Sequence, residues 1–173
     1  MSDMGLVSNL RRKKHSSYKG EMGKIAPNIL ARNFRAKTPM QKLVTDVTEF
    51  HILGKKIYFS PVMDLFNREI LSYSISLSPN MKMIDEMLER LFCTREIKKG
   101  VIMHSDQGAL YQSSSYQKNL ADKGIVQSMS RKASCLDNAV IENFFGLLKS
   151  EMFYGKDFES IEHFTEELKL III

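Results

Sequence analysis

Tryptophan is absent from this sequence, and cysteine is rare. The two cysteines, Cys93 and Cys135, form no Cys-x-x-Cys pair, and the four histidines have no zinc-finger spacing, so we expect no structural zinc site. Long apolar runs are also missing. No stretch approaches the roughly 18 apolar residues of a membrane span, and the first residues lack the apolar core of a secretory signal. We therefore expect a cytoplasmic protein with no membrane partner.

Hydrophobic residues make up 43% and charged residues 26% of the 173 positions, the balance of a soluble globular protein. This length corresponds to about one domain, and a chain of this size buries roughly 70% of its unfolded surface. The composition therefore excludes disorder throughout and predicts one globular domain with short tails.

Positive charge is concentrated near the N-terminus. Residues 1–45 hold ten Lys or Arg and two acids, a net charge of +8. The other 128 residues hold fifteen Lys or Arg and eighteen acids, a net charge of −3. We predict a basic N-terminal arm over residues 1–38. Its densest cluster would bind DNA phosphates by releasing their counterions, and consists of Arg11, Arg12, Lys13 and Lys14. A solvated tail is the alternative, because basic runs are also common in disordered termini.

Beyond the arm, the apolar pattern alternates in the way that is typical of strands and then changes to helical spacing. The order is three strands, helix, strand, helix, strand, helix, expected over residues 43–51, 55–65, 69–77, 81–92, 101–103, 113–123, 125–129 and 137–154. Short links between the first three strands favour antiparallel hairpins. This order predicts an α/β fold: a ribonuclease H-like mixed five-stranded sheet with helices on both faces.

Three acids occupy positions suited to holding divalent ions for phosphoryl transfer. Asp46 lies in the middle of the first strand among β-branched residues, where an acid without a partner is costly. Asp106 follows the strand 101–103 at its carboxyl end, where open α/β sheets place their ligands. Glu142 lies on the last long helix. Each also has a plain structural interpretation: a paired acid, a turn residue before Gly108, and an exposed helix face.

Helical geometry places Glu142 in relation to its neighbours. The buried stripe of the last helix is expected to consist of Ile141, Phe145, Leu148 and Met152. Glu142 and Lys149, seven residues apart, align beside that stripe, and Asn138 lies one turn before Glu142. This pattern predicts a carboxylate and an ammonium group at the edge of the sheet.

The sequence blocks TDVTEF, HSDQG and DNAVIENFFGLLKSE contain the three acids in order. The spacing is 59 residues between Asp46 and Asp106 and 35 residues between Asp106 and Glu142. Together these blocks resemble the DDE catalytic core shared by retroviral integrases and bacterial insertion-sequence transposases. Within that superfamily they are similar to second-frame (OrfB) transposases. The resemblance implies an integrase-type catalytic core over residues 39–170.

The resemblance also implies a mechanism. Asp46, Asp106 and Glu142 would form the catalytic triad and bind two Mg²⁺ or Mn²⁺ ions for DNA strand cleavage and strand transfer. Lys149 would contact DNA phosphate near the scissile bond. The implied partners are DNA with the element ends, target DNA, further copies of the chain, and the first-frame helix-turn-helix protein. We also expect DNA contacts from the loop that contains Arg131 and Lys132.

The sequence departs from the family pattern at both ends. Relatives begin with more of a helix-turn-helix region, of which residues 10–30 resemble the trailing end, and they continue into a further helix with Tyr-Asn and Arg-Pro-His. We therefore expect a core truncated at its C-terminus. Two other functions stay open: an inactive remnant that only binds DNA, and a ribonuclease H-type nuclease that uses similar carboxylates on an RNA–DNA hybrid.

Overall fold

The structure, a computed structural model, describes residues 23–132 and 134–172. The predicted basic cluster at positions 11–14 lies outside the described residues, and its role stays a prediction. In the part of the chain that the structure describes, no helix is both long and apolar enough to cross a membrane.

The elements follow the predicted order and confirm the α/β, ribonuclease H-like class. The strands are β1 (Lys42–Thr45), β2 (Thr48–Ile52), β3 (Lys55–Asp64), β4 (Ile70–Ser76), β5 (Ile102–Ser105) and β6 (Val126–Met129). The helices are α1 (Met81–Thr94), α2 (Ala109–Gln112), α3 (Ser114–Asp122), α4 (Ala139–Met152) and α5 (Ile161–Ile172). A short 3-10 turn, Cys135–Asp137, leads into α4.

One mixed sheet joins the strands in the order β2-β3-β1-β5-β6, with β4 paired to β3. The long strand β3 is antiparallel to β1, β2 and β4, as the short links predict. In contrast, β1 is parallel to β5, and β5 is parallel to β6. The carboxyl ends of these three parallel strands therefore meet at one edge of the sheet.

The strand predicted over residues 43–51 is interrupted, because β1 ends at Thr45 and β2 begins at Thr48. The register of both pieces on β3 runs on across the gap, which places Asp46 opposite Pro61. Proline has no N–H to contribute to a ladder. The sheet therefore has six strands where five were predicted, and Asp46 lies between two strands instead of in the middle of one.

The helix expected over residues 113–123 is confirmed as α3, whereas two other helices were not predicted. The short helix α2 precedes α3, and Ser113 caps α3 by accepting a hydrogen bond from the Tyr116 N–H (3.2 Å). The helix α5 has no counterpart among the predicted elements. It buries Phe164 and Leu168 against the face that α4 covers.

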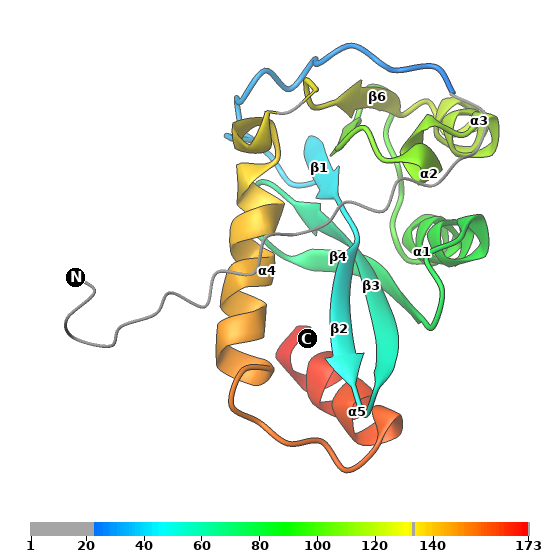
Figure 1. Cartoon of the computed structure of the whole chain (residues 1–173). Coiled ribbons are helices and arrows are strands. Elements are labelled where there is room, and N and C mark those ends of the chain that lie inside the picture. Colours follow the sequence, from blue (N-terminus) through cyan, green and yellow to red (C-terminus); the bar gives the residue numbers. More distant parts are fainter. Residues whose placement is uncertain (1–22, 133, 173) are drawn as a thin grey trace.

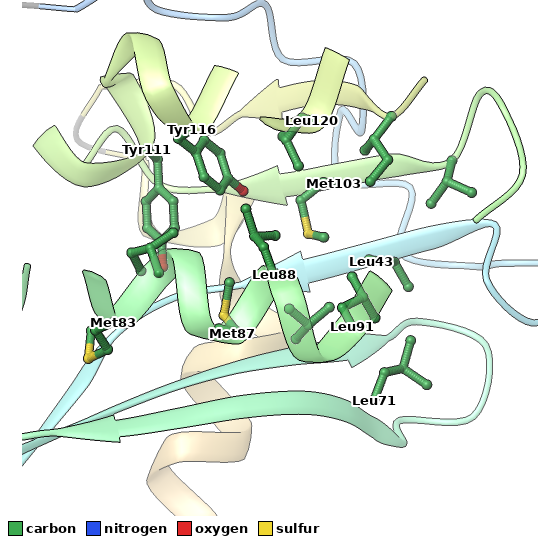
Figure 2. Packing of buried hydrophobic residues seen from close by; sticks show 14 of the residues in the cluster. Leu43, Leu71, Met83, Met87, Leu88, Leu91, Met103, Tyr111, Tyr116 and Leu120 are labelled. Atoms are coloured by element: carbon green, nitrogen blue, oxygen red, sulfur yellow. The ribbon is translucent and has the colours of Figure 1, made fainter. Parts of the chain in front are cut away.

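Helices cover both faces of the sheet (Figure 1). On one face, α1 and α3 enclose a core that includes Leu43 of β1 (Figure 2). On the other face, α4 and α5 enclose a core that includes Val44, the next residue along the strand, and the predicted stripe of α4 is buried here. Side chains alternate between faces along a strand. Asp46, two residues after Val44, therefore lies toward α4.

The described part of the predicted arm, residues 23–38, lies along β6 and crosses to the start of α4 (Figure 1). The Pro27 carbonyl accepts a hydrogen bond from the Met129 N–H (3.3 Å), and Leu30 is fully buried. This contact covers the edge of β6, where unpaired strand groups would otherwise be open to another chain.

Candidate active site

Two of the predicted acids follow neighbouring parallel strands. The register of β1 and β5 pairs Val44 with His104, so Asp46 and Asp106 come two residues later on both strands. The carboxyl ends of adjacent parallel strands lie side by side, and a hydrogen bond from the N-cap residue of α4 shows that the Asp46 side chain is directed toward that helix. The structure thus brings together two acids that are 60 positions apart in the sequence.

Short local hydrogen bonds orient the two carboxylates. Oδ1 of Asp46 accepts the N–H of Val47 (2.7 Å), and Oδ1 of Asp106 accepts the N–H of Gly108 (2.8 Å). A Cβ atom at Gly108 would lie 2.9 Å from Oδ1 of Asp106, which is too close without displacement of the carboxylate. Glycine at this position therefore leaves room for the Asp106 carboxylate. This is a second reason for glycine here, in addition to the turn that the sequence suggests.

The helix α4 approaches the strand ends with its first turn. Its N-cap residue Asn138 donates a hydrogen bond from Nδ2 to Oδ2 of Asp46 (3.3 Å). Glu142 lies one turn further along, on the same side of the helix, and is exposed. Among the described residues, no three His, Cys, Asp or Glu side chains are close enough to hold a metal ion. The structure therefore has the two aspartates at adjacent strand ends and the glutamate on the adjoining helix turn, without assembling all three.

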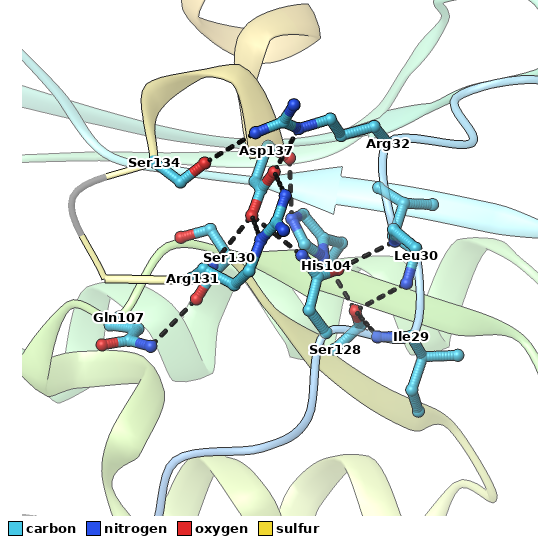
Figure 3. A network of polar contacts seen from close by, with 12 residues as sticks. Ile29, Leu30, Arg32, His104, Gln107, Ser128, Ser130, Arg131, Ser134 and Asp137 are labelled. Carbon is cyan, nitrogen blue, oxygen red and sulfur yellow. Dashed lines mark hydrogen bonds and ion pairs between the residues drawn. The ribbon is translucent and has the colours of Figure 1, made fainter.

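Asp137, directly before Asn138, is fully buried and accepts five hydrogen bonds (Figure 3). Arg131 provides three of them, from its backbone N–H and from Nε and Nη2 of its guanidinium, at 2.8–3.0 Å. Arg32 and Asn28 provide the other two. The hydrogen bonds from Arg131 hold the pKa of the Asp137 carboxyl far below its usual range. The start of α4 is thus fixed by a buried anion with two cationic partners.

His104 connects the strands to the same point. Its ring is buried between the Ser128 hydroxyl (2.8 Å from Nδ1) and the Asp137 carbonyl oxygen (2.9 Å from Nε2). The Ser128 oxygen already accepts the backbone N–H groups of Ile29 and Leu30, so its own proton is directed at Nδ1. We infer that Nε2 has the ring proton and donates it to Asp137. Burial lowers the pKa of His104, which agrees with a neutral ring.

The structure shows the surroundings of the three described residues that are predicted to contact DNA. The guanidinium of Arg131 is committed to Asp137, although the side chain is 60% exposed, whereas Lys132 is exposed beside it. Nζ of Lys149 lies 5.3 Å from the centre of the Phe50 ring, within the range of a cation–π contact. DNA binding by these three residues stays a prediction.

Tyr111 is a further residue of this region that the sequence does not single out. Its side chain is buried, and its hydroxyl makes no hydrogen bond of normal geometry with any described residue. Burial and then the charges of Asp46 and Asp106 raise its pKa well above the ordinary value, while the side chain of Thr45 acts in the opposite direction. No local sequence signal could have found it, because the approach to Asp46 depends on the fold.

The sheet order, the helices on both faces and the aspartates at adjacent strand ends define a class of protein, the integrase-type catalytic core. The Integrase core domain family matches residues 36–135, and a second family model with the same description matches residues 142–170. The first match alone spans more than half of the sequence. The chain belongs to the integrase core domain family.

Similar curated proteins are transposases of bacterial insertion sequences. The chain is 48% identical over 166 residues to the putative transposase InsK of element IS150 from Escherichia coli, covering 96% of this chain and 59% of that protein. It is 45% identical to an uncharacterized transposase-like protein of Haemophilus influenzae, covering 97% of this chain and 77% of that protein. The chain thus spans about three fifths of the length of InsK.

Solved structures agree on the fold. The catalytic core domain of HTLV-2 integrase, in complex with magnesium, superposes with a TM-score of 0.60 at 15% identity, covering 80% of this chain and 86% of that chain. A chain of the simian T-cell lymphotropic virus intasome superposes with a TM-score of 0.67 at 13% identity, covering 90% of this chain and 54% of that chain. At this low sequence identity, the structural similarity supports the retroviral integrase fold and does not assign a role to any residue.

Proposed function

We propose that this chain is the catalytic core of an insertion-sequence transposase that cleaves DNA and transfers the cut strand to a target. The proposal is supported by the β1–β5 register, in which Asp46 and Asp106 follow adjacent strands, and by the hydrogen bond from Asn138 at the start of α4 to Asp46. The similarity to insertion-sequence transposases supports DNA as the substrate.

Asp46, Asp106 and Glu142 are the residues that would hold Mg²⁺ or Mn²⁺, with two ions in the active site. The donor set fits these ions, because hard divalent cations prefer carboxylate oxygens. Such ions would supply an activated oxygen nucleophile and stabilise the charge that develops on the phosphoryl group. The magnesium in the similar HTLV-2 core domain supports the choice of ion.

The chain's own residues would orient the metal ligands and the DNA. Backbone N–H groups fix the carboxylates of Asp46 and Asp106 at the strand ends. Lys149 and Lys132 would contact phosphates, as would Arg131 while it remains bound to Asp137. The basic cluster at positions 11–14 would add affinity that depends on salt and little on sequence. Recognition of element ends, assembly of several copies and pairing with a first-frame protein belong to the same proposal.

The test compares Glu142→Gln with Glu151→Gln, which changes an exposed glutamate on the same helix. With DNA of the element's ends, the full chain should nick and join strands in Mg²⁺ or Mn²⁺, while Ca²⁺ should support binding with little turnover. Glu142→Gln should reduce both reactions to background, and Glu151→Gln should retain them. Activity near wild type in Glu142→Gln would remove the glutamate from the triad.

The same assay separates the alternatives. Hydrolysis of an RNA–DNA hybrid without joining of DNA strands would identify a ribonuclease H-type nuclease. DNA binding without nicking or joining in any of these ions would identify an inactive remnant. Either result would contradict the proposed transposase activity.

A further inference from the structure

Asn138 occupies an N-cap position but does not cap its helix. Asparagine at this position normally accepts a hydrogen bond from an N–H of the first turn, a contact worth about 1 kcal/mol. Asn80 does this at the start of α1, where its Oδ1 accepts the Met83 N–H (3.1 Å). Asn138 makes no such bond at the start of α4. The same residue type therefore has different roles at the two helices.

The side chain of Asn138 is directed at Asp46 instead. Its Nδ2 donates to Oδ2 of Asp46 (3.3 Å), although 92 positions separate the two residues. This bond also fixes the orientation of the amide, because the reverse orientation would bring two acceptor oxygens together. Together with the Val47 N–H on Oδ1 (2.7 Å), it gives each oxygen of the Asp46 carboxylate a donor.

The other end of the amide has no donor. Oδ1 of Asn138 is buried and accepts no hydrogen bond from any described residue, while the whole residue is only 3% exposed. A buried acceptor left without a donor costs about 1–3 kcal/mol. Packing alone gives no reason to retain an amide here. This amide oxygen is a hydrogen-bond acceptor held beside a carboxylate, and we expect its hydrogen-bond donor to be part of the site's function.

The position of this amide is set before any ligand binds. Asp137, the preceding residue, is held through its carboxylate by Arg131 and Arg32 and through its carbonyl by His104. The carbonyl of Asn138 itself accepts the N–H of Glu142 (3.2 Å). The backbone on both sides of the amide is therefore fixed to elements that also position Asp106 and Glu142.

We propose that Asn138 is a positioning residue of the metal site: Nδ2 orients the Asp46 carboxylate, and Oδ1 accepts a hydrogen bond from a water molecule of the divalent ion that Asp46 holds. This inference rests on the proposed function. Mg²⁺ usually keeps several waters, each of which is a hydrogen-bond donor. Groups that hold metal ligands in place commonly contribute 10–100-fold in metal affinity or activity.

The test measures Mn²⁺ binding to the full chain, from the electron paramagnetic resonance signal of free Mn²⁺, with no DNA present. Asn138→Ser is the informative variant, because serine is a good N-cap and is too short to reach Asp46. Its affinity for Mn²⁺ should fall about tenfold, while its thermal midpoint without metal should stay at the wild-type value. Asn143→Ser, an exposed site on the same helix, should change neither property.

A second readout addresses the water directly. The relaxation of water protons by each bound Mn²⁺ should differ between Asn138→Ser and wild type, and should be equal for Asn143→Ser and wild type. Wild-type Mn²⁺ affinity in both Asn138→Ser and Asn138→Ala would overturn the inference. So would an affinity loss that appears only with an equal loss of thermal stability in the metal-free protein.

Asp46→Asn separates this inference from the proposed function. If wild type binds Mn²⁺ no more tightly than Asp46→Asn, the metal site itself is wrong, and the proposed function fails with the inference. If Asp46→Asn loses Mn²⁺ and Asn138→Ser retains it, only the role of Asn138 is wrong.

Discussion

The two ends of α4 are held in opposite ways. At its start, Asp137 is fixed by hydrogen bonds of defined direction in a network with Arg131 and His104 (Figure 3), and Asn138 donates a hydrogen bond to Asp46. At its end, aromatic rings hold the helix and the following segment against the sheet. Their centroids lie 5.0–6.5 Å apart, and the rings belong to Phe50, Phe153, Phe158 and Phe164.

The two ends of α4 therefore contribute differently: the aromatic end to the stability of the fold, and the polar end to the geometry of the site. Ring packing is strong and less directional than hydrogen bonding, so the aromatic end can stabilise the fold while it tolerates small shifts. A buried carboxylate with five donors tolerates few arrangements, because any lost partner leaves a polar group without solvent. The precise end of the helix is the one that contacts Asp46. We expect changes at the aromatic end to alter stability and changes at the polar end to alter the site.

The largest loss of stability should follow Phe164→Ala. This ring is fully buried between Phe50 and Phe158, and its removal should lower the free energy of unfolding by about 4 kcal/mol. Affinity for Mn²⁺, measured at a temperature where the variant is folded, should stay at the wild-type value. Chemical denaturation provides the measurement, with the exposed Tyr154→Ala as the control. Loss of metal affinity in folded Phe164→Ala would contradict the separation.

Asp137→Asn should have a smaller effect on stability and a larger one on the site. The variant keeps the shape but leaves Arg131 and Arg32 without their shared anion, at a cost of about 3 kcal/mol at pH 7. Because the start of α4 is less well fixed, Mn²⁺ affinity should fall as well. The exposed Asp157→Asn should leave both quantities unchanged.

The same variant has a predicted pH dependence. The pKa of Asp137 in the folded state is far below its value in the unfolded chain, near 3.9. Its contribution is therefore fully present above about pH 4 and is lost as the pH falls below that value. The stability difference between wild type and Asp137→Asn should shrink from pH 4 downward. If the stability difference between wild type and Asp137→Asn stays constant down to about pH 2, the charge of Asp137 is not its cause.

The smallest effect should come from His104→Gln, which removes the acceptor for the Ser128 hydroxyl at a cost of about 1 kcal/mol at pH 7. Burial lowers the pKa of His104 below that of the unfolded chain, so its contribution is complete above about pH 6.5 and is lost as the pH falls below that value. Wild type should therefore lose more stability than the variant between pH 7 and pH 5. His51→Gln, at an exposed site, should follow wild type.

Local patterns in the sequence predict most of the architecture. Alternation and helical spacing predict the strands, α1, α3 and α4, and the approximate places of Asp46, Asp106 and Glu142 follow from these elements. The interruption at Asp46 escapes this reasoning, because it depends on Pro61 across the sheet. The helix α5 also escapes this reasoning, because its apolar side becomes part of the core only by packing against Phe50.

The supporting residues of the site could not be predicted for the same reason. Asp137 and Asn138 read as an ordinary helix start, and their partners Arg32 and Asp46 lie 105 and 92 positions away. Arg131 is a clear example of the limit. Its position in a basic loop predicts a DNA contact, while its guanidinium in the structure binds Asp137. Charge in a sequence indicates what a residue can bind and leaves open which partner is nearest.

The gap between β1 and β2 restricts how this protein can change over time. The register on β3 continues across it, so Asp46 and Val47 act as a spacer of fixed length between two halves of one strand. Deleting one of them would move Phe50 and Ile52 from the α4 side of the sheet to the α1 side. Insertions and deletions at this point would therefore destroy the core together with the site. Adaptation near Asp46 is left to side-chain substitutions, with the backbone length unchanged.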